Sequence, residues 1–95
     1  MAKRKAKSQA ASGVERAFGH VMKTLREKLG LSQMDLQVAT GLDRTFISDL
    51  ERGLQCPSLR TVIRVAKGLN VAPGDLVRRT SRSPYFTFPG DEGSL

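Results

Sequence analysis

Residues 31–53 read LSQMDLQVATGLDRTFISDLERG, and this stretch decides the fold because it holds two short helical patterns on either side of a glycine. Ser32 followed by Asp35 fits the capping-box pattern, which predicts a helix that opens here and ends near Thr40. Gly41 then supplies the residue that a tight turn needs. The first helix of the stretch is therefore expected to be about two turns long.

The second half of the stretch predicts another short helix. Asp43 is a suitable N-cap, and the helix should run through Arg52 and stop at Gly53. Its apolar side chains are expected to form part of the core or, for Phe46, to flank it: Ile47, Leu50, Leu54 and Phe46. Two short helices joined by a tight turn predict a helix-turn-helix.

Helical spacing of apolar residues continues on both sides of this pair. Spacings of three and four predict a helix over residues 14–29 that ends at Gly30, with a stripe of Phe18, Val21, Met22, Leu25 and Leu29. Pro57 and Ser58 mark the start of a fourth helix, whose apolar side carries Leu59, Val62, Ile63, Ala66 and Leu69. A fifth, short helix begins at Pro73. No segment alternates with period two, so the predicted fold class is all-α, with five helices.

The positive charge of the chain is concentrated at its N-terminus. The formal net charge is +7, yet residues 14–77 hold nine basic side chains against seven acidic ones. Residues 1–13 have no acidic side chain and four basic ones: Lys3, Arg4, Lys5 and Lys7. A basic balance indicates a polyanionic partner. We therefore predict a basic arm over 1–13, a helix-turn-helix domain over 14–79 and a C-terminal tail over 80–95.

The amino-acid composition and the motifs of the chain argue against several function classes. No run of 18 apolar residues exists to span a membrane and no apolar stretch follows the basic N-terminus, so we expect a cytoplasmic protein. Cys56 and His20 are the only residues of their types, too few for a zinc site or a disulfide. No carboxylate pair or nucleophile–base motif is visible, so we expect no enzyme, cofactor, metal or small-molecule ligand. We expect His20 to be a partly exposed helix residue and Cys56 to be an inert thiol rather than a redox switch.

The stretch over residues 31–53 resembles the helix-turn-helix domains of the Cro/repressor class, also called the Xre family, and GLDRTFISDLERG is especially similar to controller proteins of restriction-modification systems. The resemblance covers about residues 18–77, and its specific elements are Ser32-Gln33, Gly41, Ile47, Ser48, Glu51, Gly53, Pro57-Ser58 and the apolar pattern of the fourth helix. It implies a compact lambda-repressor-like domain of five helices and a transcriptional regulator that binds double-stranded DNA. It also implies a structural ion pair between Arg26 and Glu51. Two departures from the family are Gln37 and Thr40, where small and apolar residues are more usual, and Gln37 predicts a slight splay between the two helices of the motif.

The helix after Asp43 carries the candidate base-reading residues. With its apolar side chains in the core, helical periodicity turns five polar residues outward: Arg44, Thr45, Ser48, Asp49 and Arg52. Arg44 lies at the N-terminal end, which reaches deepest into the major groove in this docking mode, and an arginine can bond guanine with both arms. Thr45 and Ser48 are expected to read bases as well. Asp49 either accepts from a cytosine amine or orients Arg44 or Arg52, and we favour the orienting role.

Contacts to the DNA backbone are expected around this face. Gln33 matches the family position that bonds a phosphate, and the N-terminus of its helix adds a partial positive charge there. Arg52 and Gln55 are expected to contact further phosphates. The basic arm with Lys3, Arg4, Lys5 and Lys7 should add contacts that weaken as salt rises.

A single recognition helix presents few base-reading side chains, so we expect the chain to act as a homodimer. Two-fold symmetry would place the second recognition helix roughly 34 Å along the duplex, on an imperfect palindrome. The dimer surface is expected on the last helix and the tail, at Leu76, Val77, Tyr85, Phe86 and Phe88. For the aromatic segment YFTF over 85–88 three alternatives stay open: a strand across the dimer, packing in a neighbouring groove, or a disordered end.

Two other functions remain as alternatives to a sequence-specific regulator. One is an antitoxin-type interaction module, whose aromatic tail would capture a toxin while the helix-turn-helix regulates its own operator. The other is a sequence-blind nucleic-acid binder driven by the basic arm. Steep salt dependence without base preference would identify the latter.

Overall fold

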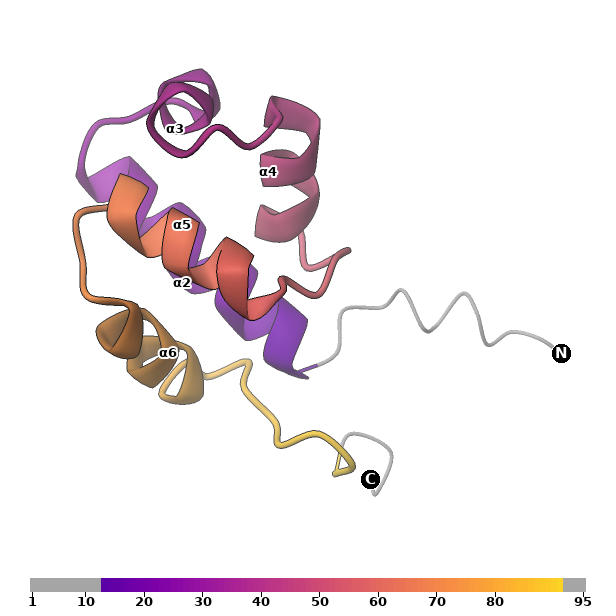
Figure 1. Cartoon of the computed structure of the whole chain (residues 1–95). Coiled ribbons are helices and arrows are strands. Elements are labelled where there is room, and N and C mark those ends of the chain that lie inside the picture. Colours follow the sequence, from indigo (N-terminus) through magenta and orange to yellow (C-terminus); the bar gives the residue numbers. More distant parts are fainter. Residues whose placement is uncertain (1–12, 92–95) are drawn as a thin grey trace, which may run out of the picture.

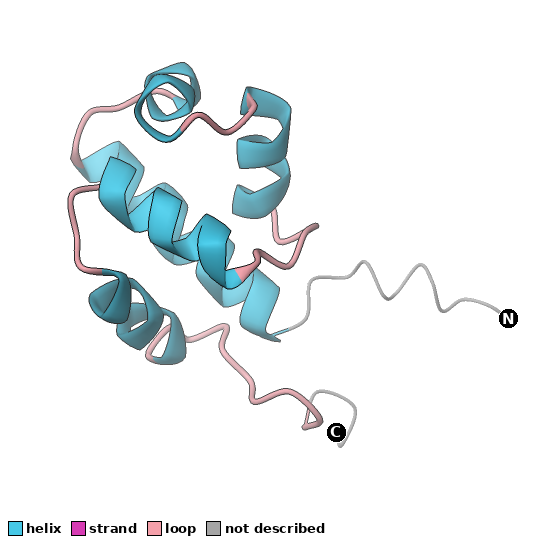
Figure 2. Ribbon diagram, viewed as in Figure 1, coloured by secondary structure: helices cyan, strands magenta, loops and turns pink. Residues whose placement is uncertain are grey.

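The computed structural model describes residues 13–91 and contains five helices connected by short loops (Figure 1). Within this part of the chain no strand is present (Figure 2), so the prediction of an all-α fold with five helices is confirmed. The helices are α2 Gly13–Lys28, α3 Gln33–Thr40, α4 Arg44–Glu51, α5 Leu59–Gly68 and α6 Pro73–Ser81.

The ends of α3 and α4 are set by the residues that the sequence singled out. Ser32 Oγ accepts from the backbone N–H of Asp35 at 2.9 Å, and Asp35 accepts from the backbone N–H of Ser32 at 2.8 Å, which completes the capping box. Gly41 closes α3 in the left-handed region with φ 77°, a conformation that glycine adopts without strain. Asp43 caps α4 by accepting from the backbone N–H of Thr45 at 2.9 Å. The predicted capping sites of the motif are confirmed.

The core is built from side chains of all five helices. Each of the following is at most 1% exposed: Met22 from α2, Leu36 from α3, Ile47 and Leu50 from α4, Val65 from α5, Leu76 from α6, and Leu69 just after α5. In Figure 1, α2 and α5 cross the middle of the molecule, α3 and α4 lie on one side of them, and α6 lies on the other. Phe46 packs against this core, as predicted. The two helices of the motif are thus anchored from behind by buried apolar contacts.

Four apolar residues that were expected on buried stripes are instead exposed. Leu54 is 45% exposed because the chain turns at Gly53, with φ 75°, before reaching it. Leu29 follows the last residue of α2, where the chain turns toward α3, and is 51% exposed. On α5 the buried stripe is Val62, Val65 and Ala66, so the first-turn residue Leu59 and the neighbouring Ile63 project away from the core. The prediction of their burial was wrong because helix ends and stripe edges are the positions that periodicity defines least well.

Gly19 explains how closely α4 approaches α2. A Cβ atom at this position would collide with the backbone carbonyl oxygens of Leu50 and Glu51 at the end of α4. A glycine inside a helix usually lowers helix stability, by about 0.5–1 kcal/mol relative to alanine. Here it lets the backbone of α4 rest directly on α2.

The C-terminal tail folds back on the helix that begins the described chain. Thr87 lies so close to Gly13 that a Cβ atom at the glycine would overlap its backbone. Tyr85 contacts α2 through an edge-to-face contact with His20, with ring centroids 5.0 Å apart. Tyr85 and Thr87 therefore hold the tail against the chain's own α2, and residues 82–91 contain no strand.

Candidate nucleic-acid interface

The two helices of the motif are joined by Gln37. Its side-chain oxygen accepts a hydrogen bond from the backbone N–H of Arg44, the first residue of α4, at 2.7 Å. The long amide side chain thus links α3 to the start of α4, and the slight splay between the two helices stays a prediction. Thr40, the other departure from the family, donates to Leu36 O at 2.7 Å and accepts from the backbone N–H of Leu42 at 3.1 Å. Both polar residues stabilise the turn that orients α4.

The outward face of α4 brings together the residues predicted to read bases. Arg44 and Thr45 are exposed at the N-terminal end of the helix, and Ser48 follows one turn later, partly exposed. Asp49 forms an ion pair with Arg52, with Oδ1 and Nη2 2.9 Å apart. The expectation that Asp49 orients an arginine is met for Arg52. Base reading by Arg44, Thr45 and Ser48 stays a prediction.

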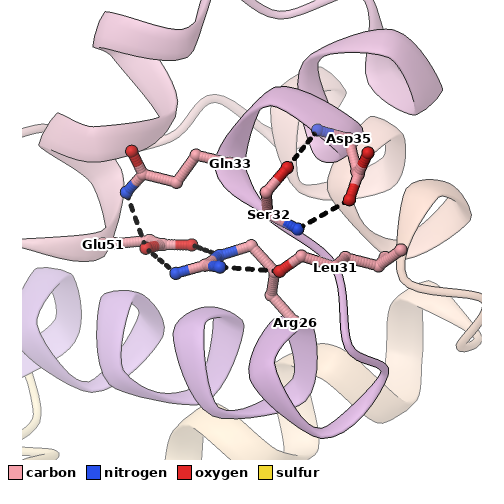
Figure 3. Close-up of polar contacts among 6 residues, drawn as sticks. All are labelled: Arg26, Leu31, Ser32, Gln33, Asp35 and Glu51. Atoms are coloured by element: carbon pink, nitrogen blue, oxygen red, sulfur yellow. Dashed lines mark hydrogen bonds and ion pairs between the residues drawn. The ribbon is translucent and has the colours of Figure 1, made fainter.

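Behind this face, one buried carboxylate ties three helices together (Figure 3). Glu51 Oε2 accepts from Arg26 Nε at 2.6 Å, and Glu51 Oε1 accepts from Arg26 Nη2 at 3.0 Å. Gln33 Nε2 donates to the same Oε1 at 3.0 Å, while Arg26 Nη1 donates to Leu31 O at 2.8 Å. The bond to Glu51 raises the pKa of the Arg26 guanidinium further above its already high usual value. The predicted ion pair between Arg26 and Glu51 is confirmed. Together with the hydrogen bond from Gln33, it joins α2, the start of α3 and the end of α4.

Gln33 has a second role that the sequence did not reveal. A primary amide nitrogen carries two hydrogens, and Glu51 takes one of them, which orients the side chain at the N-terminus of α3. The remaining N–H can serve a phosphate, so the phosphate contact of Gln33 stays a prediction with a defined geometry. Gln55 is exposed in the turn after α4. Lys3, Arg4, Lys5 and Lys7 lie outside the described residues.

The residues predicted for a dimer surface separate into different environments. Leu76 has no exposed surface, so it cannot contact a partner chain while the core is intact, and its assignment to the interface was wrong. Val77, its neighbour on α6, is 51% exposed. Tyr85 contacts its own α2, and the rings of Phe86 and Phe88 meet edge to face with centroids 5.0 Å apart. Of the aromatic residues in the tail, Phe88 remains the most exposed, at 67%.

The residues considered for other chemistry have ordinary surroundings. His20 is exposed on α2, as expected. Cys56 lies after α4, and its side chain is exposed. Desolvation by neighbouring atoms raises the pKa of its thiol, and Glu15 adds a smaller effect in the same direction. A raised pKa works against a reactive thiolate. Among residues 13–91 no group of histidine, cysteine and acidic side chains is arranged to hold a metal. No helix in the same range is long and apolar enough to cross a membrane.

Three features near the interface were not predicted from the sequence. The close approach of α2 and α4 could have been predicted from Gly19, because an isolated glycine in a helical pattern often marks close packing. The contact of Arg16 with Tyr85, with the guanidinium carbon 4.1 Å from the ring centroid, joins residues far apart in the chain and had no local signal. The same holds for the bond between Gln33 and Glu51.

Comparison with known proteins agrees with this geometry. Residues 22–76 match the model of the helix-turn-helix family, and this segment includes the whole of α3, α4 and α5. An uncharacterized HTH-type transcriptional regulator, y4dJ of Sinorhizobium fredii, is 33% identical over 66% of this chain and 82% of its own length. The control protein C.BamHI of Bacillus amyloliquefaciens is 38% identical over 67% of this chain and 80% of its own length. The crystal structure of the restriction-modification controller protein C.AhdI from Aeromonas hydrophila superposes with a TM-score of 0.62 at 36% identity, over 64% of this chain and 92% of that protein. The chain therefore belongs to the helix-turn-helix family of Xre type, a family of DNA-binding transcriptional regulators and not of enzymes.

Proposed function

We propose that this protein binds a palindromic operator as a cytoplasmic homodimer and regulates transcription from it, in the manner of a restriction-modification controller. The observation that carries the proposal is the outward face of α4, where Arg44, Thr45 and Ser48 lie over a base of fully buried Ile47 and Leu50. A face of donors and acceptors on a rigidly packed helix suits direct reading of a major groove. Similarity to proteins described as controllers supports the same role.

Arg44 provides the sharpest test of base reading. Selection of bound duplexes from a random library should return a palindromic sequence with wild-type protein. Arg44→Ala should relax the preference at one position of each half-site by about 1–3 kcal/mol, which is the usual worth of a bidentate pair. Lys28→Ala, an exposed change at the far end of α2, is the matched control and should select the wild-type sequence. Absence of any selected sequence for wild type would refute the proposal.

Dimerisation is proposed to use the half-exposed Val77 of α6 together with Phe88 of the tail. Exposed apolar side chains suit a surface that becomes buried on association, although each is small by itself. Val77→Glu should shift the protein toward monomer in sedimentation equilibrium, because burial of an unpaired carboxylate is costly. Operator affinity should fall with it. A Val77→Glu protein that remains dimeric at the wild-type concentration would place the interface elsewhere.

The basic arm is proposed to strengthen binding without adding sequence preference. Removal of Lys3, Arg4, Lys5 and Lys7 should weaken binding to all duplexes and flatten its salt dependence. The antitoxin alternative receives no support from the tail, since Tyr85 and Thr87 pack on the chain's own α2. The sequence-blind alternative predicts that the selection experiment returns no consensus.

A further inference from the structure

A shallow cationic pocket lies between α2 and the end of α4, and of its lining residues only Arg52 is among those predicted to bind DNA. It is lined by Arg16, His20, Lys23, Glu51, Arg52 and Tyr85. We propose that this pocket binds a phosphodiester group of the DNA backbone and that the C-terminal tail completes it through Tyr85. The inference rests on the proposed function and adds a further site for the DNA backbone.

The charge of the pocket favours an anion. Glu51 is the one acid among the lining residues, and its carboxylate is 2% exposed and already bonded to Arg26 and Gln33. Arg52 gives one guanidinium nitrogen to Asp49 and, with five N–H donors in total, keeps others for a ligand. Arg16 and Lys23 are exposed on α2. A phosphodiester carries one negative charge and accepts from guanidinium and ammonium groups, so it matches these donors.

The position of the pocket connects it to the predicted DNA path. Arg52 lines the pocket and is itself a predicted phosphate contact. Glu51, on the inner wall, is bonded to Gln33, the other predicted contact in this region (Figure 3). A strand whose phosphates meet Gln33 and Arg52 therefore runs beside the pocket. Lys23 and Arg16 add donors from α2 to the same pocket.

Tyr85 acts as a positioning residue in this pocket. Its ring lies 4.1 Å from the guanidinium carbon of Arg16, and it meets His20 edge to face with centroids 5.0 Å apart. A cation held over an aromatic face loses rotamer freedom before the ligand arrives, which lowers the entropic cost of binding. The packing of Thr87 against Gly13 keeps the tail on α2. The tail thus has a role on the DNA side of the molecule that does not need a second protein.

Salt dependence of DNA binding tests the proposal. Affinity for a selected operator and for an unrelated duplex of equal length is measured over a range of salt concentrations. Arg16→Gln and Lys23→Gln should each reduce the magnitude of the slope of log K against log salt, by at most about 0.9, because each removes one of the cations that face the single phosphate in the pocket. The reduction of the slope should be equal on both duplexes. Lys28→Gln, the same substitution on the same helix in a different pocket beside Arg79, should leave the slope unchanged.

Tyr85 needs a readout that separates positioning from folding. Tyr85→Ala should weaken binding to both duplexes at low salt, while Tyr85→Phe, which keeps the ring face under Arg16, should restore it. Circular dichroism confirms that each variant is folded. In an Arg16→Gln background Tyr85→Ala should have little further effect, since its action passes through Arg16.

The possible results separate the pocket proposal from the proposed function. Slopes for Arg16→Gln and Lys23→Gln that match Lys28→Gln would overturn the proposal. Titration with inorganic phosphate, followed by NMR shifts at Lys23 and Arg52, identifies a general anion site; binding of phosphate with unchanged DNA slopes would also overturn the assignment to DNA. A wild-type protein without sequence preference would refute the proposed function alone, because the slopes on unrelated DNA still report the pocket.

Discussion

Glu51 is the residue on which the geometry of the motif depends. Its carboxylate is 2% exposed and accepts from Arg26 and Gln33, so removal of the arginine leaves a buried charge without its main partner. Arg26→Met should lower the free energy of unfolding by about 3–5 kcal/mol, the usual cost of breaking a buried ion pair from one side. Urea unfolding followed by circular dichroism measures this loss.

Replacement of both partners shows which effect lowers the free energy of unfolding: the loss of the ion pair itself, or the burial of a Glu51 carboxylate that has lost its partner. Arg26→Met combined with Glu51→Met should recover much of the stability, because two apolar side chains need no partners. Lys28→Met, at an exposed position of the same helix, should change stability by less than about 0.5 kcal/mol. If Arg26→Met costs no more than Lys28→Met, the ion pair does not hold α4 in place.

At the scale of helices, Gly19 sets the separation between α2 and α4. Alanine at this position would place a Cβ atom against the carbonyl oxygens of Leu50 and Glu51, and backbone atoms cannot move aside cheaply. Gly19→Ala should therefore destabilise the protein by about 1–3 kcal/mol despite the better helix propensity of alanine. Because α4 must shift to relieve the overlap, DNA affinity should fall as well.

Gly74 provides the control for this prediction within the same fold. It lies in the first turn of α6, and a Cβ atom there would meet nothing within 4 Å. Gly74→Ala should stabilise the protein by about 0.4–1 kcal/mol, because alanine has less conformational freedom to lose on folding. Thermal unfolding of the two variants should thus show shifts of opposite sign. Equal shifts would mean that helix propensity, and not the approach of α4, governs Gly19.

For the whole molecule, the sequence predicted what local patterns determine. The Ser32–Asp35 capping box, the turn at Gly41 and the cap at Asp43 all appear in the structure, since each depends on neighbours in the chain. The joining of Gln33 to Glu51 and the docking of Tyr85 on α2 depend on how distant segments meet, which no periodicity encodes. The shared carboxylate and the cationic pocket belong to this second class.

The balance of charges also sets how the whole domain responds to acid. The hydrogen bond from the backbone of Ser32 lowers the pKa of Asp35 below its usual value of 3.8, and the bond from Arg79 does the same for Asp75. Once the chain unfolds these partners are lost, so the unfolded state binds protons more readily than the folded state near this pH. The stabilisation from both carboxylates is thus present above pH 3.8 and is lost as the pH falls through the lowered folded values.

Urea unfolding at a series of pH values tests this linkage. The free energy of unfolding should change little between about pH 7 and pH 5 and should fall below about pH 4. The double variant Asp35→Asn, Asp75→Asn should be less stable than wild type at neutral pH and should lose less stability on acidification, because two of the titrating groups are gone. Glu27→Gln, which replaces an exposed acid on α2, should retain the wild-type acid slope. A double variant with the same slope as wild type would show that other carboxylates carry the acid sensitivity, and that the cap of α3 and the first turn of α6 hold without the charge of their aspartates.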